Sequence, residues 1–183
     1  MAGHTENSIV IQAPLKLVWD VTNDVAGWPG LFTEYASAEI VERRGETVRF
    51  RLTMHPDEEG RIWSWVSDRT VNAADRTVHA HRVETGPFAY MQIHWRYEEL
   101  PGGGTRMTWI QDFAMKPTAP VDDQGMTDRL NTNSPVQLEV IKAKVEALAA
   151  DPNAAQPSTA GPSTAGPSTA GPSAADPRTA EKE

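Results

Sequence analysis

The sequence predicts an α+β domain in which a strongly curved, seven-stranded antiparallel sheet wraps around one long C-terminal helix. Two observations lead to this fold class. Six consecutive segments alternate with period two at hairpin spacing, and an apolar stripe over residues 138–148 repeats with helical spacing. A single alternating segment at the start of the chain adds the seventh strand. The chain has 183 residues, which suits one such domain plus an appendage.

The first part of the chain predicts a strand, a short helix and an irregular connection. The alternating stretch NSIVIQ forms the strand, which ends before Pro14. The stretch APLKLVWDVTND then predicts a helix, with proline near its start and Asn23 near its end. In GWPGLF a proline interrupts the pattern, so we expect Trp28 and Phe32 to lie on a tight, irregular connection.

The middle of the chain predicts a meander of six strands. They are expected at Ala36–Arg43, Thr47–His55, Arg61–Val71, Thr77–Glu84, Ala89–Glu98 and Thr105–Met115. The breaks between them are RRGE, HPDEEG, NAADR, TGP and PGGG, all rich in turn-forming residues. Consecutive hairpins of this kind predict a curved antiparallel sheet.

The last element of the domain is helical. Its apolar stripe consists of Leu138, Ile141, Val145 and Leu148. Pro135 is either the first helical residue after an N-cap at Ser134, or an interior residue of a longer helix that begins near Asp122. A curved sheet closed by one long helix is a helix-grip arrangement, and it leaves space for an internal cavity where a ligand can bind.

The folded domain is expected to span residues 1–150, and residues 151–183 form a tail. From Pro157 the tail repeats PSTAG, and it has no apolar side chain large enough to offset the entropy of ordering. We therefore expect a disordered tail. It acts either as a solubilising linker, which we favour, or as a docking segment.

Composition excludes several functions. With no cysteine there is no disulfide framework, cysteine zinc site or thiol nucleophile. A formal charge of −8 without a basic cluster argues against nucleic acid as a partner. The start MAGHTENSIVIQ lacks the features of a secretory signal, and no stretch reaches the roughly 20 apolar residues of a membrane span. We expect a cytoplasmic protein with no membrane partner.

One face of the predicted strand GRIWSWVSDRT is unusual. Period two places Trp63, Trp65, Ser67 and Arg69 on the same side. A dry core would have to pair this guanidinium or bear a cost of several kcal/mol. The corresponding faces of the following strands carry Arg82; Met91, Ile93 and Trp95; and Trp109, Gln111 and Phe113. Indoles, two arginines, a hydroxyl and an amide together indicate a partly hydrated, aromatic-walled cavity.

Simpler interpretations exist for each of these residues taken alone. Any one tryptophan fits an ordinary core, Arg69 could reach solvent from a strand end, and Arg82 could pair with Glu84 or another surface carboxylate. The shared parity of the whole set favours the cavity. His79 and His81 share the opposite face, but no third ligand is evident, so we expect no metal site.

Several stretches resemble one enzyme family. GWPGLFTEYASAE, FRLTMHPDEEGRIWSWVSDRT, TGPFAYM and WIQDFAMKP look like the single-domain aromatase/cyclases of bacterial type II polyketide synthases, in particular the tetracenomycin and spore-pigment kind. The resemblance covers nearly all of Met1–Ala150. It implies a START/Bet v 1-like helix-grip fold and no metal, nucleotide or redox cofactor.

The resemblance also implies an activity and its partners. The substrate would be a poly-β-ketone tethered to an acyl carrier protein and supplied by the ketosynthase of a type II complex. The enzyme would direct first-ring aldol cyclisation of the C9–C14 type, followed by dehydration to an aromatic ring, in the synthesis of a spore pigment or an antibiotic.

Matching the family's pocket onto this chain implies a set of site residues. Arg69 is the central residue and Tyr35 is its acid/base partner. The cavity would be lined by Trp28, Phe32, Trp63, Trp65, Ser67, Arg82, Phe88, Met91, Trp95, Trp109 and Gln111, with Gln137 contributed by the final helix. The chemistry suits these types, because a fixed guanidinium can stabilise a developing alkoxide and a phenol can protonate it.

Two other classes of function remain open on the sequence alone. The same fold commonly supports non-catalytic carriers of hydrophobic ligands, for which loss of Arg69 would lower affinity only modestly. An interaction domain acting through its tail would instead lose its function on tail removal.

Overall fold

The computed structural model describes residues 2–151 and contains one seven-stranded antiparallel sheet in the order β1-β7-β6-β5-β4-β3-β2. The strands are β1 (Gly3–Ile11), β2 (Tyr35–Arg44), β3 (Thr47–Met54), β4 (Ser64–Asn72), β5 (Thr77–Arg82), β6 (Phe88–Glu99) and β7 (Thr105–Met115). The helices are α1 (Leu15–Asn23), the 3-10 turn η1 (Val25–Gly27), α2 (Trp28–Leu31) and α3 (Asp123–Ala150).

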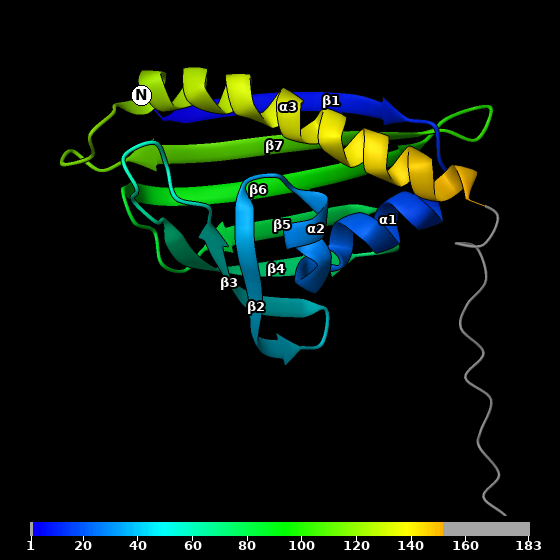
Figure 1. Cartoon of the computed structure of the whole chain (residues 1–183), viewed down its shortest axis with the longest axis horizontal. Coiled ribbons are helices and arrows are strands. Elements are labelled where there is room, and N and C mark those ends of the chain that lie inside the picture. The colour runs from blue at the N-terminus through cyan, green and yellow to red at the C-terminus, as the bar shows by residue number, and fades with distance from the viewer. Residues whose placement is uncertain (1, 152–183) are drawn as a thin grey trace, which may run out of the picture.

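The sheet and the long helix confirm the predicted helix-grip fold. Strands β2 to β7 pair consecutively, and β1 closes the other edge by pairing with β7. Helix α3 lies lengthwise along β1 and β7, while α1 and α2 lie across the neighbouring strands (Figure 1). The core fills the space between sheet and helices, where α3 contributes Leu138, Ile141 and Val145. Within residues 2–151 no helix is both long and apolar enough to cross a membrane.

Helix α3 is the longer of the two helices that the sequence allowed. It begins after Asp122, whose Oδ1 accepts a hydrogen bond from the Gly125 amide at 2.8 Å, and it continues through Pro135. The alternative start at Ser134 is wrong. The Ser134 hydroxyl does not cap a helix, because it donates to Gln111 Oε1 on β7 at 3.1 Å.

The connection after α1 is more regular than predicted. The segment expected to be irregular forms η1 and the single turn α2, with Pro29 in the first turn of α2. Proline suits this position, because its fixed φ matches a helix and its missing N–H would have no partner there. Trp28 and Phe32 are both buried, and both rings lie against Trp95 on β6.

Strand β4 begins three residues later than predicted, at Ser64, because Asp57 organises the preceding loop. Its Oδ1 accepts from the backbone amides of Glu59 and Arg61 at 3.0 and 2.9 Å. Its Oδ2 accepts from Arg61 Nε at 3.0 Å and Trp63 Nε1 at 3.2 Å. These bonds, chiefly that from the Arg61 backbone, lower the pKa of Asp57 to about 2.

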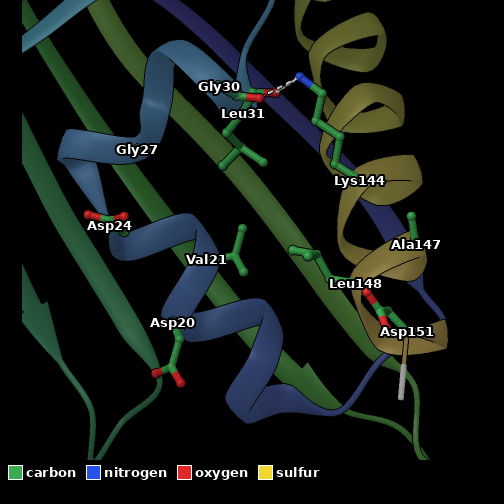
Figure 2. A pocket seen from close by; sticks show the side chains of 10 residues that line it. All are labelled: Asp20, Val21, Asp24, Gly27, Gly30, Leu31, Lys144, Ala147, Leu148 and Asp151. Atoms are coloured by element: carbon green, nitrogen blue, oxygen red, sulfur yellow. Dashed lines mark hydrogen bonds between the residues drawn. The ribbon is translucent and has the colours of Figure 1, made fainter. Parts of the chain in front are cut away.

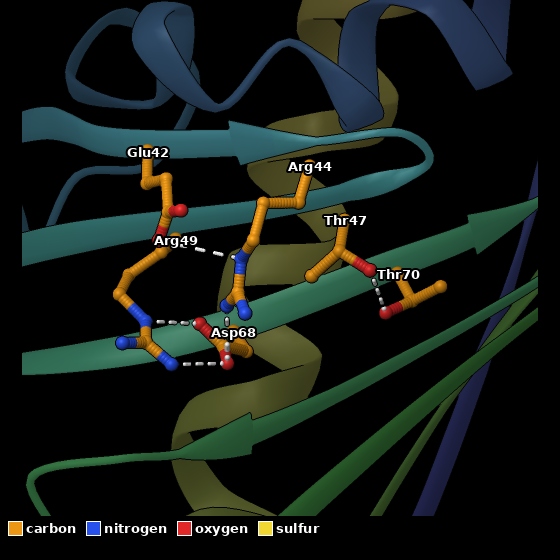
Figure 3. Close-up of polar contacts among 6 residues, drawn as sticks. All are labelled: Glu42, Arg44, Thr47, Arg49, Asp68 and Thr70. Atoms are coloured by element: carbon orange, nitrogen blue, oxygen red, sulfur yellow. Dashed lines mark hydrogen bonds and ion pairs between the residues drawn. The ribbon is translucent and has the colours of Figure 1, made fainter.

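On β4, Asp68 points to the convex face of the sheet, as the alternation of the strand predicts. Asp68 accepts two 2.7 Å hydrogen bonds from Arg49, its partner in the β3–β4 register, and a longer one from Arg44 (Figure 3). The hydrogen bond from Arg49 is the main reason why the pKa of Asp68 lies below its ordinary value. Since neighbouring residues of a strand point to opposite faces, Arg69 points to the concave side.

The predicted tail lies outside the described residues, apart from Asp151. We expect truncation after Ala150 to leave the melting temperature and the product profile nearly unchanged, because the removed sequence has no large apolar side chains to pack. Thermal denaturation and product analysis of the two proteins check this. Loss of activity with an unchanged melting temperature would instead identify the repeats as a docking segment.

Candidate active site

Arg69 lies inside the protein, with 2% of its surface exposed. Its guanidinium stacks over Trp95 at 4.1 Å and lies 5.2 Å from the ring centre of Trp28. Burial lowers the pKa of Arg69 to about 10, so the side chain stays charged at neutral pH. The interpretation that Arg69 reaches solvent from a strand end is therefore wrong.

The polar partners of Arg69 come from α1 and β6. Its Nη2 donates to Asn23 Oδ1 at 2.8 Å, and it also hydrogen-bonds the Tyr97 phenol. The Tyr97 hydroxyl lies 2.7 Å from the hydroxyl of Thr22. Sequence reasoning missed both partners of Arg69, and it also missed Thr22. The sequence could have identified Tyr97, because the alternation of the strand places it on the same face as Trp95.

Tyr35 lies near Arg69 but has a different hydrogen-bond partner. Its phenol is buried and hydrogen-bonds the side chain of Glu34, a residue that the sequence analysis did not single out. Burial, with the adjacent charge of Glu34, raises the pKa of Tyr35 well above its ordinary value. The phenol therefore stays protonated at neutral pH and can donate a proton. Burial also raises the pKa of Glu34.

Arg82 packs against aromatic rings on the same side of the sheet. Its guanidinium lies 4.0 Å from the ring centre of Trp65 and 4.7 Å from that of Phe88. The suggested ion pair with Glu84 does not form, because Glu84 accepts hydrogen bonds of 2.9 and 2.7 Å from Arg51 on the opposite face. Burial lowers the pKa of Arg82 to about 10, which leaves it charged at neutral pH.

Aromatic rings fill the interior around Arg69. Trp28 is at their centre and lies 5.3 to 6.1 Å, between ring centroids, from Phe32, Phe50, Trp95 and Tyr35. Three buried N–H donors have no acceptor within residues 2–151: Arg69 Nε, Trp95 Nε1 and Trp109 Nε1. A buried donor without a partner costs about 1–3 kcal/mol, and such groups are rare outside functional sites. These donors are available to oxygen atoms of a ligand.

The two glutamines assigned to the site connect elements of the fold. Gln111 Oε1 accepts from Thr5 and Ser134, both at 3.1 Å, and so joins β7 to β1 and α3. Gln137 exchanges hydrogen bonds with Thr33, accepting from its backbone amide at 3.1 Å and donating to its hydroxyl at 2.9 Å. The structure also buries Ser67 and Met91 on the faces that the sequence predicts, and it buries Phe88 at the start of β6, beside a register shift between Phe88 and Tyr90.

Trp63 does not lie with the other sequence-predicted residues. It precedes β4, is 40% exposed, and its indole N–H donates to Asp57 in the loop. The expectation that Trp63 faces the interior is therefore wrong: the loop delays the start of β4 to Ser64, so Trp63 lies outside the strand and does not share the face of Trp65.

We expect Trp63→Ala and Trp65→Leu to behave differently. Trp65 is nearly buried and contacts Arg82 and Tyr35, so its loss should destabilise the protein moderately and shift products toward other chain foldings. Trp63→Ala should leave the product ratio unchanged. Melting temperatures and product ratios measured on the same preparations check this. An altered product ratio for Trp63→Ala, with an unchanged ratio for Trp65→Leu, would show that Trp63 belongs to the site.

One hollow lies between the α1–α2 segment and the end of α3 (Figure 2). It measures about 710 Å³ and is lined by Asp20, Val21, Asp24, Gly27, Gly30, Leu31, Lys144, Ala147, Leu148 and Asp151. A second hollow of about 270 Å³ lies beside His79 and His94 on the sheet. Neither is lined by Arg69 or Tyr35. An internal cavity around Arg69 therefore stays a prediction.

A third histidine, His94, lies beside His79 on the convex face of the sheet. The β5–β6 register brings His94 beside His79, with ring centroids 4.5 Å apart. Over residues 2–151, however, no three His, Cys, Asp or Glu side chains are arranged to hold a metal ion.

Comparison with known proteins identifies the family. Residues 11–132 match the model of the family described as polyketide cyclase/dehydrase and lipid transport. A Streptomyces cyaneus protein named as a polyketide cyclase is 62% identical over 149 residues, which cover 81% of this chain and 97% of that protein.

Solved structures show the same fold. The ZhuI aromatase/cyclase of Streptomyces sp. R1128 superposes with a TM-score of 0.72 at 25% identity, over 80% of this chain and 94% of that one. A START superfamily protein from Mycobacterium smegmatis has a TM-score of 0.66 at 15% identity, over 79% and 98% of the two chains, and shows the fold alone. The chain belongs to the polyketide cyclase/dehydrase and lipid transport family.

Proposed function

We propose that this protein directs the first-ring aldol cyclisation of a carrier-protein-bound poly-β-ketone, of the C9–C14 type, and its dehydration to an aromatic ring. That it is a polyketide cyclase enzyme follows from the family match and from the 62% identity to a polyketide cyclase over most of both chains. The observation that carries the mechanism is the buried, charged Arg69 among aromatic rings, with three N–H donors left without acceptors.

The aldol step requires proton transfer and charge stabilisation. A water molecule takes a proton from the carbon between two ketones, that carbon attacks a second carbonyl carbon, and the electron pair of the broken C=O π bond moves to its oxygen. Arg69 stabilises the resulting alkoxide, since a guanidinium offers several N–H donors and keeps its charge. The Tyr35 phenol, held protonated by its raised pKa, donates a proton to this alkoxide, which becomes the new hydroxyl, and the proton taken up by water returns to Tyr35.

Dehydration then removes that hydroxyl with a proton from the neighbouring carbon, and the ring becomes aromatic by enolisation. Both steps are redox-neutral, so their balance needs no oxidant or reductant. The aromatic walls hold the flexible chain in one folded conformation and exclude bulk water. Positioning contributes more here than strong acid/base chemistry, because adjacent carbonyls already acidify the reacting C–H bonds.

A reconstituted assay tests the proposal. The protein is added to a minimal ketosynthase and acyl carrier protein, and the products are analysed with and without it. One dominant first-ring regiochemistry supports the cyclase, and an unchanged mixture of spontaneous products overturns it.

The family description also covers lipid transport, so a carrier is the second candidate. A carrier would bind a polyketone or fatty acyl probe, measured by quenching of tryptophan fluorescence, without changing the products. It would also keep most of that affinity in Arg69→Ala.

A further inference from the structure

We infer that the C-terminal end of α1, acting through Thr22, Asn23 and Tyr97, is the anchor that holds Arg69 in its working position. These three are positioning residues, because they act through the guanidinium. The inference rests on the proposed role of Arg69 and extends it to residues of a helix that the sequence analysis did not connect with the site.

The first step is that Arg69 is a buried cation without a carboxylate. Burial opposes its charged form, which is favoured by the phenols of Tyr97 and Tyr35 and by the hydrogen bond to Asn23 Oδ1. An isolated charge in such a position is costly unless surrounding dipoles and hydrogen bonds stabilise it. The stabilisation therefore has to come from neutral groups.

The second step fixes the direction of one hydrogen-bond chain. The Thr22 hydroxyl lies 2.7 Å from the carbonyl oxygen of Val18, to which it donates its single proton. The Tyr97 hydroxyl, 2.7 Å from Thr22, must then donate to the Thr22 oxygen. The lone pairs of Tyr97 are thereby left to accept from Arg69, as their hydrogen bond requires.

The third step concerns Asn23. Its Nδ2 donates to the carbonyl oxygen of Trp19 at 2.9 Å, which fixes the orientation of the amide. Its Oδ1 consequently faces Arg69 and accepts from Nη2 at 2.8 Å. Together with the stacking on Trp95 at 4.1 Å, these contacts determine the position and the plane of the guanidinium.

The fourth step is electrostatic. Both chains start from residues of the last turn of α1, Thr22 and Asn23, and end on the carbonyls of Val18 and Trp19, one turn earlier in the helix. The C-terminal end of a helix carries partial negative charge, which stabilises a cation. A carboxylate would neutralise Arg69 and compete with an incoming alkoxide. Neutral partners keep the charge available, and Arg69 Nε keeps its N–H without an acceptor.

The test uses the full chain with Asn23→Ala and Tyr97→Phe. Matched controls are Asn131→Ala, at an exposed position of α3, and Tyr90→Phe, at a position on β6 that is 40% exposed. In the reconstituted assay, we expect each site variant to lower kcat about 10- to 100-fold with little change in KM, since a misplaced charge weakens the transition state selectively. The controls should match wild type.

Asn23→Asp separates positioning from simple structural support. The new carboxylate should pair with Arg69 and keep the melting temperature within a few degrees of wild type. We expect the variant nevertheless to lose regiospecific product as fully as Asn23→Ala. A folded Asn23→Asp protein with wild-type kcat would overturn the inference.

A measurement without substrate distinguishes failure of the anchor from failure of the proposed function. In protein labelled with ¹⁵N-arginine, the Arg69 Nε–H signal is assigned by its absence in Arg69→Lys. We expect that signal to shift and to exchange faster with water in Asn23→Ala and Tyr97→Phe, but not in the controls. An unchanged signal overturns the anchor, whatever the assay shows. If the wild-type protein has no effect on the products, the proposed cyclase function is overturned, whatever the Arg69 Nε–H signal shows.

Discussion

Arg69→Ala is expected to abolish regiospecific cyclisation while leaving the protein folded. Arg69 forms no carboxylate pair that its removal would break, and the variant no longer bears the cost of burying a charge. An oxyanion donor removed from a water-excluded site typically lowers the rate about 10²- to 10³-fold. Product ratio and melting temperature, measured on the same preparation, check the prediction.

Two conservative variants test the donor geometry of Arg69 and the role of Tyr35 separately. Arg69→Lys should restore little activity, because an ammonium cannot reproduce the planar set of N–H donors that meets Asn23 and Tyr97 together. Tyr35→Phe should be milder, since water can replace a phenol as a proton donor more easily than it replaces a fixed charge. A wild-type product ratio from folded Arg69→Ala would remove the mechanism.

Trp28→Ala is expected to cause the largest loss of stability among the aromatic variants. The indole contacts four other rings at centroid distances of 5.3 to 6.1 Å and donates to the carbonyl of Thr22 at 3.1 Å. Removing a buried indole typically costs about 3–5 kcal/mol, which lowers the melting temperature of a domain this size by about 10 °C or more.

Trp28→Phe provides the matched control for Trp28→Ala. It keeps most of the ring contacts and loses the hydrogen bond to Thr22, so the expected loss of stability is smaller. Urea denaturation gives the free energies of unfolding for both variants. Equal, small losses in Trp28→Ala and Trp28→Phe would show that the interior around Trp28 is loosely packed or hydrated, contrary to the ring contacts described.

The sheet could be predicted from the sequence because its signal is local. Side chains of a strand alternate between faces through backbone geometry alone, so Trp65, Arg69 and Trp95 could be assigned to one side before any pairing was known. The hairpin turns then arranged the strands in sequence order. Tyr97 has the same parity, so its position on this face could also be predicted. Its hydrogen bond to Arg69 could not.

Where the elements begin depended on competition between local and distant contacts. Asp57 gathers four hydrogen bonds in its loop and delays β4, so Trp63 is exposed. Ser134 has the chemistry of an N-cap, but its hydroxyl bonds Gln111 instead, and the helix starts at the Asp122 cap. Sequence spacing reports the local preference of a residue and not the tertiary partner that replaces it.

By itself the sequence determined the fold class, the parity of the interior face and the presence of Arg69 on it, because these follow from periodicity and residue type. Only the tertiary structure decided what holds that arginine. Asn23 lies 46 positions before Arg69, and no local pattern connects them. A hydrogen bond of 2.8 Å depends on the packing of α1 against the sheet, which is the sum of many contacts spread over the whole chain.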